Sequence, residues 1–178
     1  MSTLIVENLK GPTTGANANK VIVPSGQTLL AQGHVLQSQS STFNGSSTNS
    51  TSMVAMSTCG SITTTEANSK IYVNVAAQMQ TGRNTQHGLG VGALRSSADS
   101  YASDLHLQAI ANYMTSSNGW VQGGGNFHIL HSPNVAAGTT ITYKIYGRRQ
   151  ATDKVSLYVI DAWGLGAFGQ FSALELAP

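Results

Sequence analysis

Residues 69–79 read Ser69-Lys70-Ile71-Tyr72-Val73-Asn74-Val75-Ala76-Ala77-Gln78-Met79. Apolar side chains recur at every second position, which is the period of a β-strand with one buried and one solvated face. The residues on the apolar face are Ile71, Val73, Val75, Ala77 and Met79. The polar face carries Tyr72, Asn74 and Gln78. This stretch therefore predicts a half-buried strand at the centre of a β protein.

The same period continues on both sides of this strand, and turn residues bound each segment. At Asp104–Met114 the apolar residues fit a helical stripe about as well, and we assign strand because both neighbours are β. Strands without helices between them exclude parallel βαβ units, so we expect an all-β antiparallel sandwich, best described as jelly-roll-like. The other predicted strands are His34–Gln39, Ser52–Ser57, His87–Arg95, Tyr101–Tyr113, Trp120–His131, Thr139–Arg149, Lys154–Ala162 and Gln170–Ala177.

The composition agrees with a β protein whose surface is polar but nearly uncharged. Only 9% of the 178 residues are Asp, Glu, Lys or Arg, against roughly 25% in an average soluble protein. This excludes coiled coils and charged disordered chains. The formal net charge of +2 also argues against a nucleic-acid binder. No stretch is long and apolar enough to be inserted in a membrane.

Residues 1–32 differ from the rest and predict a separate attachment segment, followed by a knob domain over residues 33–178. Two short apolar patches are separated by a Gly, Pro and Asn-rich loop, and together they are too small to form a core. We expect them to pair with copies of themselves or with a larger assembly. The residues of the two patches are Leu4, Ile5, Val6, Val21, Ile22 and Val23.

The residues with catalytic or metal-binding chemistry form no recognisable motif, so we expect neither an enzyme nor a cofactor. The remaining case for a metal is a histidine near a three-fold axis, where three copies could hold one ion. Cys59 is the single cysteine, and we interpret it as a small buried residue. His128 and His131 are three apart, which places them on opposite faces of a strand. The glycines from Gly88 to Gly92 lack the helix of a dinucleotide site. Seven scattered carboxylates leave a polysaccharide-degrading enzyme as a minor alternative.

Basic residues concentrate in the loops predicted at one end of the sandwich. If the strands alternate in direction, the loops Ser40–Ser50, Gln80–Gln86, Thr115–Gly119 and Arg148–Lys154 share the end far from residue 33. The loops Cys59–Asn68, Ser96–Ser100, Ser132–Gly138 and Gly164–Gly169 share the near end. The far loops hold four of the nine basic residues and would attract anionic glycans. The candidate binding residues are Arg83, Asn84, Asn118, Trp120, Arg148, Arg149 and Lys154.

The chain resembles the short tail-fibre proteins of marine, cyanophage-type tailed bacteriophages. The resemblance rests on the opening from Met1 to Leu29, with its Leu9-Lys10-Gly11-Pro12-Thr13 turn, and on Ser61 to Val73. It also includes Gly33 to Gln39 and the ending from Phe171 to Ala177. One departure is Leu94-Arg95-Ser96-Ser97, where the family carries an arginine-glycine-serine turn, and we expect a turn of different geometry there.

The resemblance implies a homotrimer, made in the host cytoplasm, that attaches to other virion proteins through residues 1–32. It also implies that the knobs face outward. We therefore interpret the chain as a fibre-type virion protein that recognises a host-surface polysaccharide or lipopolysaccharide. A capsid or tail decoration protein with a purely structural role remains the alternative. No nucleic acid, membrane or cofactor is expected as a partner.

Overall fold

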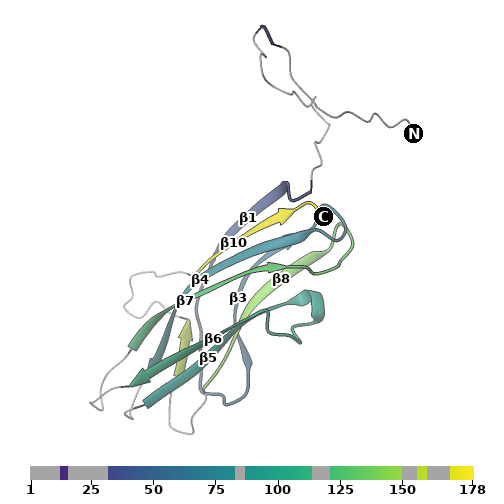
Figure 1. Cartoon of the computed structure of the whole chain (residues 1–178). Coiled ribbons are helices and arrows are strands. Elements are labelled where there is room, and N and C mark those ends of the chain that lie inside the picture. The colour runs from purple at the N-terminus through teal and green to yellow at the C-terminus, as the bar shows by residue number, and fades with distance from the viewer. Residues whose placement is uncertain (1–12, 16–31, 83–86, 114–120, 150–155, 160–168) are drawn as a thin grey trace. The chain divides into compact units, whose positions relative to one another are not determined.

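A computed structural model describes residues 13–15, 32–82, 87–113, 121–149, 156–159 and 169–178. The chain divides into two units, Met1–Ala31 and Gln32–Pro178. All regular secondary structure described below belongs to the second unit (Figure 1). The predicted attachment residues Leu4, Ile5, Val6, Val21, Ile22 and Val23 lie outside the described residues.

The described residues form ten strands and one short 3-10 helix, and the strands account for nearly all of the regular structure. The elements are β1 (Val35–Phe43), β2 (Ser47–Thr48), β3 (Val54–Thr63), β4 (Lys70–Gly82), β5 (His87–Ser96), η1 (Ser97–Asp99), β6 (His106–Tyr113), β7 (Val121–His131), β8 (Thr140–Arg149), β9 (Ser156–Val159) and β10 (Gly169–Leu176). The predicted all-β class is confirmed.

The strands form two antiparallel sheets that pack face to face (Figure 1). In one sheet, β1 pairs with β10 and β10 with β4. β4 also pairs with β7 and with β9, and β9 pairs with β2. The other sheet has the order β3-β8-β5-β6. Four antiparallel pairs are nested in the sequence: β5 with β6, β4 with β7, β3 with β8, and β1 with β10. Such nested pairs arise when one long antiparallel hairpin folds over so that its successive strand pairs belong alternately to the two sheets. This topology is the jelly roll.

The core lies between the two sheets and follows the alternation in the sequence. In β4, the residues predicted to face inward are all buried, whereas Tyr72 is 42% exposed. In β8, Ile141, Tyr143 and Ile145 are fully buried, and Phe127 from β7 and Phe171 from β10 pack with them. Burial of these apolar faces is the main stabilising contribution to a two-sheet sandwich.

Glycines within the strands permit close packing of the core. Gly169 begins β10, and a Cβ at this position would lie 2.1 Å from Cζ of the buried Phe43. Gly92 lies in β5, where a Cβ would lie 2.4 Å from the methyl carbon of Met79. The glycines from Gly88 to Gly92 are therefore part of a strand, and they precede no helix that could receive a dinucleotide.

Several details of the predicted strand arrangement are wrong. The strands β1 and β3 extend to Phe43 and Thr63, into the predicted loops Ser40–Ser50 and Cys59–Asn68, and β2 was not predicted. The predicted strand Tyr101–Tyr113 begins only at His106, because residues 97–105 form η1 and a turn with Ser100 and Tyr101 at positive φ. In addition, β9 and β10 both pair antiparallel with the same edge of β4, so they run in the same direction. The loop Gly164–Gly169 was expected to turn at the near end, and these strand directions contradict that expectation.

The other strand directions agree with the predicted alternation. Arg149 at the end of β8 pairs with Gly90 near the start of β5, which defines the far end of the sandwich. At the near end, the amide of Ala177 donates a hydrogen bond to the carbonyl of His34, so the last strand closes beside the first. The two ends carry different side chains, and their chemistry is described next.

Candidate functional site

Arg148 and Arg149 are the predicted binding residues that the structure describes. They end β8 at the far end, where Arg148 pairs with Val91 and the amide of Arg149 donates a 2.8 Å hydrogen bond to the carbonyl of Ser50. Their backbones are therefore held by two neighbouring segments. Because successive side chains in a strand point to opposite faces, the two guanidinium groups leave the strand in opposite directions.

Both arginine side chains are half-buried, and neither Nε has a hydrogen-bond partner among the described residues. Among the described residues, the only ion pair joins Arg95 and Asp104. The positive charges of Arg148 and Arg149 are thus not neutralised by a described carboxylate. Both Nε atoms are themselves buried, so an anionic ligand would be bound by the terminal guanidinium nitrogens, whose geometry suits a carboxylate, sulfate or phosphate group.

The remaining predicted binding residues lie outside the described residues. They are Arg83, Asn84, Asn118, Trp120 and Lys154. Arg83 and Asn84 lie between β4 and β5 in the sequence, and Lys154 lies between β8 and β9. β4 and β8 end at the far end of the sandwich, and β5 and β9 begin there.

An ordered cluster of aromatic and basic side chains covers the outer face of the β3-β8-β5-β6 sheet. The Arg95 guanidinium lies 4.8 Å from the ring centre of Tyr146, and the Lys144 ammonium lies 4.6 Å from that of Tyr101. The Tyr101 and Tyr146 ring centres are 6.0 Å apart. These alternating cation and ring contacts stabilise the loop that follows β5 on the outside of the sheet.

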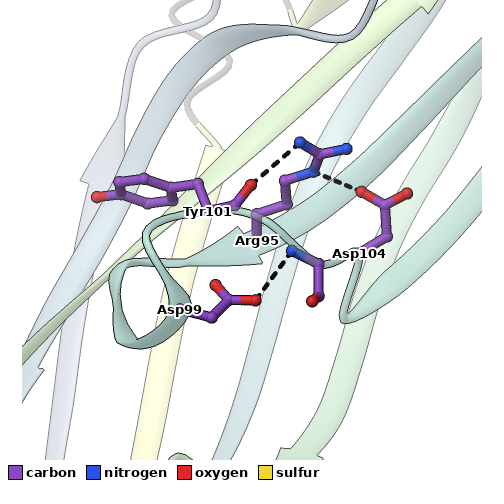
Figure 2. Close-up of polar contacts among 5 residues, drawn as sticks. Arg95, Asp99, Tyr101 and Asp104 are labelled. Carbon is purple, nitrogen blue, oxygen red and sulfur yellow. Dashed lines mark hydrogen bonds and ion pairs between the residues drawn. The ribbon is translucent and has the colours of Figure 1, made fainter.

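Figure 2 shows how polar contacts hold that loop. Arg95 donates from Nε to Asp104 at 2.5 Å and from a terminal nitrogen to the carbonyl of Tyr101 at 3.1 Å. Asp99 accepts a hydrogen bond from the amide of Ser103 at 2.9 Å. The sequence indicated Lys144 and Tyr146 as outward residues of one strand. It gave no signal for Tyr101, because that contact depends on the fold of a separate loop.

The outer face of the opposite sheet contains a hollow of about 360 Å³, and none of the residues that line it is charged. Residues of β1, β4 and β10 line it, and six of the eight carry a hydroxyl or amide group. The lining residues are Ser40, Ser41, Thr42, Asn74, Ala76, Gln170, Phe171 and Ser172. Sequence reasoning missed this hollow, because it forms only when three strands that are distant in the sequence align in register.

Glu175 is the second residue that sequence reasoning missed, because it was one of several scattered carboxylates. It is fully buried in β10. Its oxygens accept hydrogen bonds from the backbone amides of Thr65 and Glu66. They also accept from the hydroxyl of Ser69 and from the side-chain amide of Gln37. Burial by itself would raise the pKa of Glu175, but these donors outweigh it and hold the pKa below its ordinary value. The carboxylate is therefore a structural anion.

Cys59 is buried and His131 half-buried, and both are held in packing contacts. Burial raises the pKa of Cys59 to about 12, so its thiol stays protonated at neutral pH. Burial lowers the pKa of His131, and the negative charge of Asp99, which raises it, offsets this only in part. His131 Nδ1 lies 3.0 Å from the Tyr143 hydroxyl. His128 is exposed and His131 half-buried, as the predicted opposite faces require.

The described residues contain no group of three or more His, Cys, Asp or Glu side chains that could hold a metal ion. In the same part of the chain, no helix has the length and apolar character needed to cross a bilayer.

Comparison with known proteins gives distant structural similarity alone. No family model matches the chain, and no curated protein is similar to it. The chain is similar to a protein of infectious bursal disease virus strain Gx at 14% identity and a TM-score of 0.34, covering 89% of this chain and 42% of that one. For the VP2 subviral particle of that virus, the values are 12%, 0.35, 94% and 46%. The chain spans less than half the length of these structures, and similarity at this level carries no functional argument.

Proposed function

We propose that the chain is a virion structural protein of the short tail-fibre type, which attaches through residues 1–32 and presents its jelly roll to host-surface glycans. The observation that carries this proposal is the pair Arg148 and Arg149, which ends β8 at the far end without a described acidic partner. The resemblance of the sequence to phage fibres supports the virion role, and the jelly roll is compatible with it.

Anionic polysaccharide or lipopolysaccharide is the ligand class that this end favours. The two guanidinium groups diverge from one strand end, so they reach two anionic groups more readily than one. In the proposed homotrimer, three copies of this end would add their charges, and low-affinity contacts would sum through multivalency. Such binding weakens as ionic strength rises, because the charges are partly exposed.

Glycan binding by the full chain tests this proposal. The Arg148→Ala/Arg149→Ala variant should lose at least about tenfold in affinity for an anionic host polysaccharide on an array, equivalent to about 1.4 kcal/mol. Arg148→Lys/Arg149→Lys keeps the charge and should retain much of the binding. Lys70→Ala removes an exposed cation near the opposite end and serves as a control. Unchanged binding by the alanine variant would contradict the role of the far end.

A capsid or tail decoration protein is the second candidate, and the buried, unreactive Cys59 and the structural Glu175 are equally compatible with it. Absence of binding to every host polysaccharide would favour this role. Release of reducing sugar ends by the protein would instead identify a hydrolase. The native mass of the full chain tests the proposed trimer, for which we expect three times 18.6 kDa.

A further inference from the structure

Four strands align their side chains in straight rows across the outer face of the β1-β10-β4-β7 sheet. The middle row contains Ser40, Ser172, Asn74 and His128, one from each strand. All four residues are exposed. Neighbouring strands are about 4.8 Å apart, so this row presents closely spaced hydroxyl, amide and imidazole groups on a rigid backbone.

The hollow lies between this row and the next, which contains Thr42, Gln170 and Ala76. It exists because the serines and Ala76 are small, whereas longer side chains border them. None of the polar side chains Ser40, Thr42, Asn74, Gln170 or Ser172 makes a side-chain hydrogen bond to a described residue. Their donors and acceptors are thus available to a ligand that brings both kinds of group.

The charge around the hollow differs from that of the opposite face of the sandwich. The rows that border the hollow contain no Asp, Glu, Lys or Arg among the described residues. The outer face of the other sheet carries Arg95, Lys144 and Arg148. A charged ligand would gain no ion pair at the hollow and would lose hydration there, so a neutral ligand rich in hydroxyl groups fits best.

An exposed aromatic ring borders the hydrogen-bonding row on its other side. Tyr72 is 42% exposed and precedes Asn74 by two residues, so both side chains lie on the same face of β4. Its cross-strand partner Leu130 is 51% exposed. The apolar face of a sugar ring can pack on Tyr72 while its hydroxyl groups reach the row beyond.

We propose that this hollow, with Tyr72 beside it, binds a neutral oligosaccharide. The inference rests on the proposed glycan-binding function and deepens it by adding a second ligand class at a site separate from the arginine end. The sugar displaces water from Asn74, Ser172 and Gln170, which the strands hold in place before binding. Binding at this face is insensitive to salt, in contrast to binding at Arg148 and Arg149.

NMR of the full-length, isotopically labelled protein provides the test, with neutral hexasaccharides of glucose, galactose and mannose as probes. At least one probe should shift the side-chain amide signals of Asn74 and Gln170, equally at low and high salt. Asn74→Ala and Ser172→Ala should each weaken that binding about tenfold or more. Thr58→Ala removes an exposed hydroxyl from β3, in the other sheet, and should change nothing.

Three outcomes overturn the inference. The first is that no probe shifts these signals, and the second is that the shifts fall on other residues. The third is that a second copy of the chain covers Tyr72 and Leu130, which crosslinks between copies of the Leu130→Cys variant would show. None of these outcomes affects binding of anionic polysaccharide at Arg148 and Arg149, which the same titration measures separately with an acidic hexasaccharide.

Discussion

Glu175 and Ser69 meet in the interior, where the serine hydroxyl donates a 2.7 Å hydrogen bond to the buried carboxylate. The two residues are 106 positions apart, and the contact joins β10 to the segment before β4. Thr65 contributes its amide at 2.8 Å and its hydroxyl at 2.9 Å to the same carboxylate. The near end of the sandwich is therefore organised around one anion.

The Glu175→Gln variant should lower the free energy of unfolding by about 2–3 kcal/mol at pH 7, because an amide NH₂ would face donors. For a chain of this size, the midpoint of thermal unfolding should fall by roughly 5–10 °C. Differential scanning calorimetry measures the change. Glu66→Gln alters an exposed carboxylate next to the network and should have little effect. Equal stability of the wild type and Glu175→Gln would contradict the anchoring role.

The contribution of Glu175 should also depend on pH, with a sign that follows from its lowered pKa. A carboxyl group whose pKa is lower in the folded state stabilises the fold above its unfolded pKa, near 4.5. That stability is lost as the pH falls through the folded value. The difference between the wild type and Glu175→Gln should therefore shrink below about pH 4.5. A difference that stays constant down to pH 2 would rule out this linkage.

Gly169→Ala should destabilise the sandwich by about 1–3 kcal/mol, because the new methyl group would overlap the buried ring of Phe43. Phe43→Leu shortens that side chain, so the double variant should lose less than the sum of the two single variants. Urea unfolding of the four proteins gives the coupling energy. An additive double variant would show that the two positions do not compete for space.

Cys59 should react with a thiol reagent such as dithiobis-nitrobenzoate at least about a hundredfold more slowly in the folded protein than in denaturant at pH 8. Burial raises its pKa to about 12 from 9.0 and also blocks access. The absorbance of the released thiolate follows the reaction. Fast labelling of the folded protein would mean that β3 opens far more readily than its packing indicates.

Arg95→Lys should cost about 1 kcal/mol, because lysine cannot contact Asp104 and the Tyr101 carbonyl while also stacking on Tyr146. Thermal unfolding measures this loss. Lys144→Arg keeps a cation beside Tyr101 and should be nearly neutral. If Arg95→Lys unfolds like the wild type, the contacts of Arg95 with Asp104, Tyr101 and Tyr146 do not stabilise the domain.

The strands were predictable because their alternation is local. The apolar face of β4 and residues Ile141, Tyr143 and Ile145 of β8 are buried as the period of two indicates. The strand assignment of the ambiguous stretch before Met114 is also confirmed, by β6. The common direction of β9 and β10 was not predictable, because alternation fixes which face is buried and contains no information about strand direction.

The candidate sites were less predictable than the fold, for a related reason. Arg148 and Arg149 became candidate residues because strand alternation, a local property of the sequence, assigns their loop to the far end. The hollow brings together Ser40, Asn74 and Ser172 through strand register, and the donors to Glu175 come from segments far from β10. Such sites depend on long-range pairing, which short sequence patterns do not encode.

The nested pairing of the strands sets an order for assembly of the domain. β5 and β6 are the closest partners in sequence, whereas β1 must wait for β10 at the other end of the domain. Closing that largest loop comes late because it costs the most chain entropy. During synthesis, β1 therefore keeps this edge unpaired until β10 has left the ribosome. Chaperones that shield such edges would protect the nascent chain from aggregation over that interval.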